Sequence, residues 1–378
     1  MKRQLERIAI PGEHEARERT WHITEAAFAE RQPTPQRSRR KLAAVCAVAV
    51  AGSVAVATLS SPGQALIRSI RETVGVSGSQ TALFSLPATG QLLVHSDSGI
   101  WVVQADGSKR RLGAYASASW SPHGLYVAAT RTDALYALTP GGEERWSLAR
   151  PSVRAPRWTG TKTDTRIAYT SGNELRVVGG DGRGDLGLAS APDIGLAPLA
   201  WRPGRRHVLA YALVQQRILL VVDVDAKGEE IWSRRIAGRV TRLEWSSDGR
   251  FLLAFAPHGL RVYDARGKVV ARDDPSVGTR DADATFLPGT HRVAIVRLHG
   301  AQSDVFLLGS GRSLFHVAGR LGQLEASPDG RWLLVAWPDA DQLLFVPVHG
   351  GRLRAVANIS AQFRSQTFPR TEGWCCAG

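Results

Sequence analysis

Histidines and aspartates in predicted loops are the side chains of this sequence best suited to chemistry. They are His95, His123, His258 and His299, together with Asp97, Asp133, Asp304, Asp339 and Asp341. Imidazole and carboxylate groups serve as acid–base catalysts and metal ligands, so a converging set would form a reactive site. Their spacing singles out no such set, because loop His and Asp are usually solvated turn residues. We therefore predict no catalytic and no metal-binding residues.

Other motifs of catalysis and cofactor binding do not occur. The sequence has no HExxH, P-loop, dinucleotide-binding or Gly-x-Ser-x-Gly motif. Residues 181–185 (DGRGD) contain an Arg-Gly-Asp tripeptide and alternating acids, as calcium and adhesion motifs do, but their glycines predict a turn between strands. We expect no cofactor.

The three cysteines show no zinc-ligand spacing. Cys46 lies in an apolar run, whereas Cys375 and Cys376 are adjacent near the C-terminus. The adjacent pair is either two free thiols or a possible disulfide, within the pair or between chains, and a disulfide requires an oxidising compartment.

The formal charge of +14 does not indicate nucleic-acid binding. Of 48 basic residues only six are lysine, which leaves 48 − 6 = 42 arginines, a bias typical of GC-rich genomes. The basic residues are dispersed along the chain and form no stripe that would follow a phosphate backbone. We predict no nucleic-acid partner.

One segment predicts a membrane anchor. Residues 42–59 (LAAVCAVAVAGSVAVATL) contain no charge and would span about 27 Å as a helix. Basic residues precede this segment, so the positive-inside rule places 1–41 in the cytoplasm and the rest of the chain outside the cell membrane. A cleaved signal peptide (site at 55–57) or a twin-arginine signal (38–42) are the alternatives. Alanines at every fourth position also make a homodimer possible.

Two short helices are predicted beside the anchor. The cytoplasmic segment 1–41 contains an amphipathic pattern whose apolar face includes Trp21, Ile23, Ala27 and Phe28. A segment this short cannot form its own core, so we expect the face to bind a partner protein, a second copy or the membrane. Residues 60–79 predict a juxtamembrane stalk helix.

Residues 80–378 form a repeat with a period of about 40, which predicts an all-β, seven-bladed β-propeller with four strands per blade. Each unit has an apolar strand ending in a turn, two more apolar strands and a polar strand. The repeated turns begin at Ser85, Trp120, Trp158, Trp201, Trp245, Phe286 and Ala326. We expect the aromatic members Trp120, Trp158, Trp201, Trp245 and Phe286 to fill the space between blades. The match between residues 367–374 and 85–90 favours a C-terminal latch that closes the ring, with a partial eighth unit as the alternative.

The turn Trp245–Gly249 (WSSDG) and its counterparts resemble those of TolB-type and WD-repeat propellers. The resemblance covers about residues 80–360, although no Trp-Asp dipeptide occurs. Trp146 and Trp232 look similar to the outer-strand tryptophans of quinoprotein-type blades. The whole chain is similar to uncharacterised membrane-anchored propeller proteins of high-GC bacteria, a resemblance that implies no known activity.

We therefore expect a membrane-anchored, extracytoplasmic binding module that is not an enzyme. Its partner would be a protein or another ligand, and its N-terminal segment would relay to or tether a cytoplasmic regulator such as a sigma factor. The alternative is an extracytoplasmic enzyme, either a metal-dependent lactonase or a quinoprotein-like oxidoreductase.

Overall fold

The computed structural model describes residues 85–159, 161–204 and 206–376. The predicted cytoplasmic helix with Trp21, Ile23, Ala27 and Phe28, the anchor at 42–59 and the stalk at 60–79 lie outside these residues. Within the described ranges, no helix is long and apolar enough to cross a membrane.

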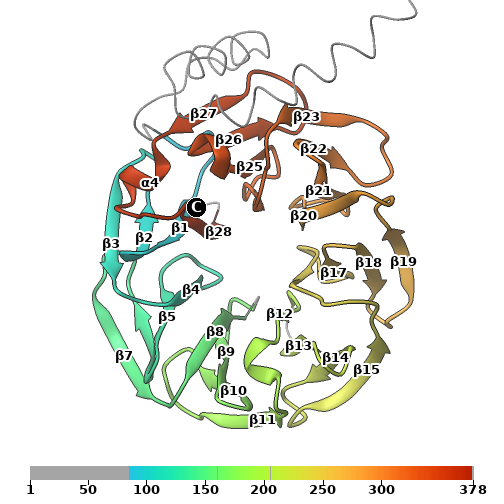
Figure 1. Cartoon of the computed structure of the whole chain (residues 1–378). Helices are drawn as coiled ribbons and strands as arrows, with labels where there is room; N and C mark the ends of the chain where they lie inside the picture. Colours follow the sequence, from blue (N-terminus) through green and yellow to red (C-terminus); the bar gives the residue numbers. More distant parts are fainter. Residues whose placement is uncertain (1–84, 160, 205, 377–378) are drawn as a thin grey trace, which may run out of the picture. The chain divides into compact units, whose positions relative to one another are not determined.

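The described strands form seven four-stranded antiparallel sheets arranged in a ring, which confirms the predicted seven-bladed propeller (Figure 1). We letter the strands of each blade A to D from the axis outwards and number the blades 1 to 7 around the ring. The A strands are β28 (Arg370–Cys375), β4 (Ser117–Trp120), β8 (Val153–Trp158), β12 (Leu199–Trp201), β16 (Arg242–Trp245), β20 (Thr279–Phe286) and β24 (Leu324–Ala326). The B strands are β1 (Gln91–Ser96), β5 (Val127–Arg131), β9 (Arg166–Ser171), β13 (Val208–Leu213), β17 (Phe251–Ala256), β21 (Val293–His299) and β25 (Trp332–Trp337).

The outer half of each blade has the same layout. The C strands are β2 (Gly99–Val103), β6 (Ala134–Leu138), β10 (Glu174–Gly179), β14 (Ile218–Asp223), β18 (Gly259–Asp264), β22 (Gln302–Leu307) and β26 (Gln342–Pro347). The D strands are β3 (Lys109–Gly113), β7 (Glu144–Ala149), β11 (Leu186–Ser190), β15 (Glu229–Arg235), β19 (Val269–Asp273), β23 (Ser313–Ala318) and β27 (Arg354–Ala357). Among the described residues, three short helices lie in loops: η2 (Ile194–Leu196), η3 (Pro338–Ala340) and α4 (Ile359–Gln362).

Side-chain hydrogen bonds explain why the repeated turn sequence reverses the chain between strands A and B. In blade 5 the Ser246 hydroxyl donates to Asp248 Oδ1 at 2.7 Å and accepts the Phe251 N–H at 3.0 Å. Gly249 adopts a φ of +67°, which favours glycine. Blade 7 repeats the pattern, with Ser327 bonded to Asp329 at 2.6 Å.

The core consists of apolar clusters between neighbouring blades. Trp158, for example, packs with Leu135 of blade 2 and with Ile167 and Tyr169 of blade 3. The aromatic residues of the repeat each end an A strand: Trp120, Trp158, Trp201, Trp245 and Phe286. Trp120 is half-buried and the other four are buried, so these side chains join one blade to the next.

The ring closes through the C-terminal strand. β28 pairs antiparallel with β1, with Trp374 opposite Leu92 and Arg370 opposite His95. Blade 1 therefore takes its A strand from the far end of the chain, and residues 85–90 form no strand of their own. Gly90 has a φ of +105°, and a Cβ there would lie 2.5 Å from the Cys375 carbonyl oxygen, so the segment before β1 lies close against the end of β28.

The two outer-strand tryptophans connect adjacent blades. Trp146 on β7 donates its indole N–H to the Gly180 carbonyl at 3.0 Å, and a Cβ on Gly182 would lie 2.8 Å from its ring. Trp232 on β15 repeats this contact two blades later, between blades 4 and 5, with the Ala265 carbonyl at 3.1 Å and a Cβ on Gly267 2.7 Å away. Each ring covers the C–D turn of the following blade.

This contact predicts that Gly182→Ala destabilises the propeller more than Gly184→Ala. Both glycines have positive φ, +83° and +65°, but a Cβ at Gly184 meets nothing within 4 Å. The two variants share the backbone strain, so the difference between their stabilities isolates the cost of displacing Trp146. We expect this cost to be about 1–3 kcal/mol. Melting temperatures of both variants measure it, and equal losses would show that the Trp146 contact contributes nothing.

Candidate binding face

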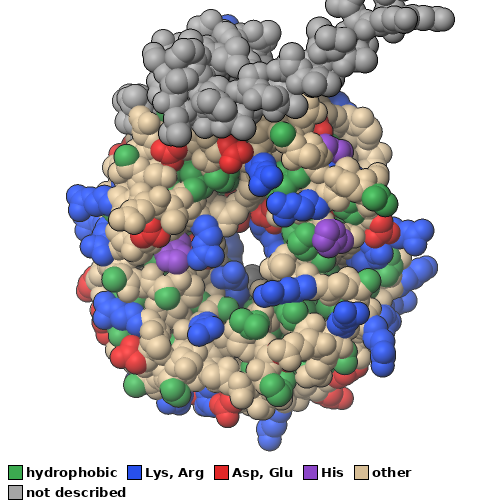
Figure 2. Space-filling view, in the orientation of Figure 1, with side chains coloured by type: hydrophobic (Ala, Val, Ile, Leu, Met, Phe, Trp, Pro, Cys, Tyr) green, Lys and Arg blue, Asp and Glu red, His purple; other side chains and the backbone are tan. Residues whose placement is uncertain are grey.

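The two faces of the ring carry different loops. The A–B and C–D turns lie on one face, which we call the AB face, and the B–C and D–A loops lie on the other, the DA face. The D–A loops lead into the innermost strands, so their residues border the axial channel. Viewed along the axis, the ring is hollow at its centre and Lys and Arg side chains surround the opening (Figure 2).

An axial cavity of about 440 Å³ is lined by the innermost strands. Because side chains alternate along a strand, every second residue faces the channel while its neighbours pack between blades. Thus Arg242 and Glu244 line the cavity, whereas Trp245 is buried in the cluster between blades 4 and 5. A second cavity of about 650 Å³ shares Arg157, Arg370 and Glu372 with the first.

On one side of the axial cavity, three carboxylates surround one guanidinium. Arg242 forms ion pairs with Glu244 at 3.1 Å, Asp283 at 3.1 Å and Glu325 at 3.3 Å. Burial acts to lower the pKa of Arg242, but attraction to Glu325, Asp283 and Glu244 outweighs it and raises that pKa. The three acids belong to blades 5, 6 and 7, so this cluster also connects the inner ends of those blades.

The pKa of the Glu325 carboxyl is raised to about 7, chiefly by burial. Arg242 opposes this rise, while Asp283 and Glu244 add to it by repulsion. Asp283 accepts backbone N–H groups of Ala284 and Leu324, and Glu244 accepts that of Phe286. Among the described residues only Arg242 hydrogen-bonds Glu325, so no backbone N–H stabilises its ionised form.

The opposite side of the cavity is basic. Arg157 comes from β8 and Arg370 from β28, and both line it together with Glu372. Arg370 donates to His95 Nδ1 at 2.9 Å, and Glu372 lies 3.7 Å from the same nitrogen. Burial raises the pKa of Glu372, while attraction to Arg157 and Arg370 opposes that rise.

The histidines and aspartates of predicted loops are distributed over both faces. His95 and Asp97 border a cavity on the DA face, His258 another cavity on that face, and His299 lies 3.4 Å from Asp304. His123 belongs to an A–B turn on the opposite face, where its Nε2 contacts the Lys162 carbonyl at 2.7 Å. Across the described residues, no group of three or more His, Cys, Asp or Glu side chains could hold a metal ion.

Several of the aspartates hold loops in place. Asp97 accepts N–H groups of Gln366 and Thr367, which holds its pKa at about 2 and ties blade 1 to the segment before β28. Asp341 accepts the N–H and hydroxyl of Ser360, and Asp339 accepts the Arg320 N–H. No side-chain contact of Asp133 occurs among the described residues.

The Arg-Gly-Asp tripeptide is part of a C–D turn. Its aspartate, Asp185, is almost fully buried, with 7 % of the side chain exposed, and pairs with Arg150 at 2.5 Å and Arg176 at 2.8 Å. Tyr169 donates a further hydrogen bond to it at 2.7 Å. The carboxylate joins blades 2 and 3 and is not available to an external ligand.

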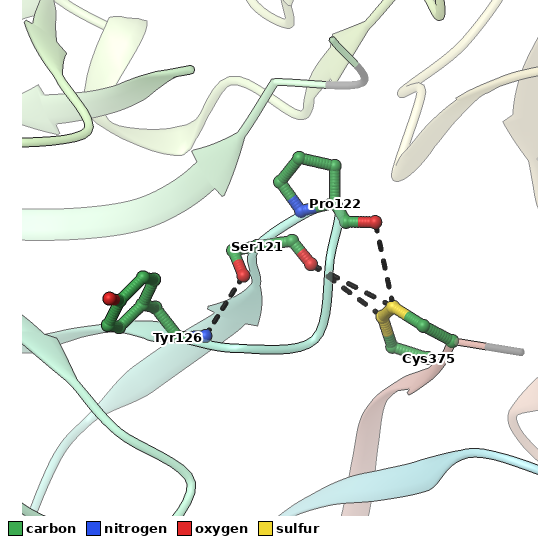
Figure 3. Close-up of a disulfide and its surroundings, with 5 residues drawn as sticks. Ser121, Pro122, Tyr126 and Cys375 are labelled. Carbon is green, nitrogen blue, oxygen red and sulfur yellow. Dashed lines mark hydrogen bonds between the residues drawn. A yellow bond between two sulfur atoms is a disulfide. The ribbon is translucent and has the colours of Figure 1, made fainter. Parts of the chain in front are cut away.

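Cys375 and Cys376 form a disulfide at the end of β28 (Figure 3). The sulfurs lie against the A–B turn of blade 2, with Cys375 Sγ 3.7 Å from the Ser121 carbonyl and Cys376 Sγ 3.8 Å from that of Pro122. The pair therefore packs the end of the closing strand against the next blade, on the AB face.

Sequence reasoning did not find the cavity residues Arg157, Arg242, Glu244, Asp283, Glu325, Arg370 and Glu372. The signal lay in strands that end in a buried aromatic residue and carry charge at alternate positions, as in Arg242-Leu243-Glu244-Trp245. That pattern shows that the charged side chains face the axis. It does not show which blades bring them together.

No protein-family model matches the chain, and no curated protein matches it. Solved structures do. A chain of the mitotic checkpoint complex has a TM-score of 0.53 and 16 % identity over 72 % of this chain and 93 % of that one. The Cps50 (Swd1) propeller of Myceliophteria thermophila gives 0.53 and 16 % over 74 % and 96 %, and the Neurospora crassa Pan2 WD40 domain gives 0.50 and 10 % over 65 % and 79 %. At these identities the similarity shows the fold, a seven-bladed propeller with WD40 propellers as structural neighbours.

The raised pKa of Glu325 predicts a pH-dependent effect of Glu325→Gln. An acid whose pKa is higher in the folded than in the unfolded state contributes to stability. This contribution is complete below about pH 4.5 and is lost as the pH rises through about 7. Glutamine stays neutral, so the free energy of unfolding of the variant should match that of the wild type at pH 5 and exceed it by about 1–3 kcal/mol at pH 8. Unfolding measured at both pH values tests this, with Glu143→Gln, whose side chain is 68 % exposed, as the control. A difference independent of pH would contradict it.

Proposed function

We propose that this seven-bladed propeller is a non-catalytic module that binds a protein partner through its DA face. The observation that carries the proposal is the axial cavity, which is lined by unpaired as well as paired charges and borders the D–A loops. Leu196 and Val277, in two of these loops, expose apolar side chains. Polar contacts beside exposed apolar side chains are the usual composition of a protein interface.

We further propose that the module is anchored by the apolar segment at 42–59 and acts outside the cell membrane. The basic residues before that segment and its lack of charge support this orientation. A disulfide at Cys375–Cys376 fits an oxidising compartment. The TolB-type turn and the likeness to anchored propellers of high-GC bacteria are consistent with it. The face with Trp21, Ile23, Ala27 and Phe28 would then bind a cytoplasmic regulator, and the alanine spacing would allow a homodimer.

Geometry gives the enzymatic alternatives less support. His95 and His123 lie on opposite faces, so they cannot join one metal site. Trp146 and Trp232 are on outer strands, where their indole N–H groups bind the neighbouring blade. Neither tryptophan lines the axial cavity, where a quinone ring would lie.

Crosslinking in intact membranes tests the arrangement. We expect the full chain and a variant lacking residues 1–31 to capture the same extracytoplasmic protein, and the full chain alone to capture a cytoplasmic one. Protease added to intact cells should digest the propeller. A propeller that is digested only after the membrane is broken would contradict the extracytoplasmic location, and identical partners for both chains would contradict the tethering role.

A further inference from the structure

Three arginines are grouped around the axial cavity and the cavity that adjoins it. Arg154, Arg157 and Arg370 line the two joined cavities, yet none forms a salt bridge with a described carboxylate. Arg154 and Arg370 are exposed, and Arg157 is half-buried. Guanidinium groups grouped around a concave surface are a suitable site for carboxylates, which they bind through charge-assisted hydrogen bonds.

Other arginines of the ring already have partners. Arg176 pairs with Glu174 and Asp185, Arg261 with Asp274, and Arg297 with Asp273 and Asp281. Within the axial cavity, Arg242 is paired with three carboxylates, whereas Arg157 and Arg370 form no ion pair with a described carboxylate. Their charges are available to an external ligand.

One carboxylate of the chain lies near these arginines and attracts two of them, Arg157 and Arg370, without forming an ion pair with either. Glu372, two residues after Arg370 on β28, accepts no hydrogen bond from a described residue; it lies 3.7 Å from His95 Nδ1 and is attracted by Arg157 and Arg370. It faces the same cavity as Arg157 and Arg370. A negative ligand bound there would be repelled by Glu372, so this residue limits the affinity of the site.

The shape of the site decides between a protein and a membrane surface. Arg157 lies on the inner strand β8, within the ring, where a flat bilayer reaches less easily than a projecting side chain. The larger cavity adds hydroxyl groups from half-buried Ser117 and exposed Thr132, together with exposed Leu196. Hydroxyl groups and an apolar side chain around a cationic centre suit a peptide segment with both acidic and apolar residues.

We propose that Arg154, Arg157 and Arg370 form a carboxylate-binding site for an acidic segment that projects from the protein partner into the axial cavity. This inference rests on the proposed function and adds the chemistry of the partner to it. A partner whose contact segment is neutral or basic would leave the binding module intact and overturn the carboxylate site only.

The test uses the full chain in detergent micelles at pH 8, with fluorescein-labelled hexaglutamate as probe and hexalysine as its counterpart. Arg157→Gln and Arg370→Gln should each weaken hexaglutamate binding by about tenfold, because each removes a guanidinium from the site. Arg312→Gln, which removes the same charge from an exposed C–D turn on the AB face, should change it less than about twofold. This control separates a local site from general attraction to a chain of charge +14.

Glu372→Gln should change hexaglutamate binding in the opposite direction. Removing the repelling carboxylate should tighten hexaglutamate binding by about threefold or more, a gain that a merely structural role would not produce. Unchanged melting temperatures show that each variant is folded, and Arg370→Gln replaces Arg157→Gln if the latter does not fold.

Three results would overturn the site. The first is an equal loss of hexaglutamate binding for Arg157→Gln and Arg312→Gln, and the second is weaker hexaglutamate binding by Glu372→Gln. The third is that Arg157→Gln weakens binding to vesicles containing phosphatidylglycerol as much as it weakens binding to the peptide. The last result would assign the arginines to a membrane surface.

Discussion

The pairing of β28 with β1 is the contact on which the rest of the structure depends. Every apolar cluster formed by the described residues lies between two neighbouring blades, so blades 1 and 7 are covered on both sides only when the ring is closed. Without β28, blade 1 would lack its innermost strand and β1 would be an open edge, which is prone to pair with other chains. The same strand places Arg370 and Glu372 in the axial cavity and brings the Cys375–Cys376 disulfide against blade 2. Closure and the candidate site therefore share residues.

The axial strands have to satisfy two requirements with alternate side chains. One set fills the apolar contact between blades, and the other lines a channel in which unpaired charge is costly. Around Arg242 this cost is met by three carboxylates, and two of them, Glu244 and Asp283, in turn accept hydrogen bonds from blades 6 and 7. Around Arg157 and Arg370, among the described residues, Glu372 attracts both arginines but forms no ion pair with either. The presence of ion pairs therefore distinguishes Arg242, which connects blades of the ring, from Arg157 and Arg370, which we propose bind a ligand.

Sequence predicted the repeating parts of the fold well, because their causes are local. Turns such as Trp245–Gly249 recur with the same hydrogen bonds, and the similarity of residues 367–374 to 85–90 anticipated closure by the C-terminal strand. The site could not be predicted in this way. Arg157, Glu325 and Arg370 come from blades 3, 7 and 1, and only closure of the ring brings them together. The contacts of Trp146 and Trp232 could not be predicted from the sequence either, because their partner carbonyls are more than 30 residues away in the next blade.

The central claim, that a protein partner binds the DA face, is tested most directly by site-specific photocrosslinking in intact cells. Leu196 lies on the DA face and Leu125 in an A–B turn on the AB face, and their exposures are similar, 54 % and 61 %. A photoreactive amino acid at each position samples the two faces at matched accessibility. The account predicts a discrete crosslinked protein from position 196 and none from position 125. A crosslinked protein from position 125 alone would contradict it.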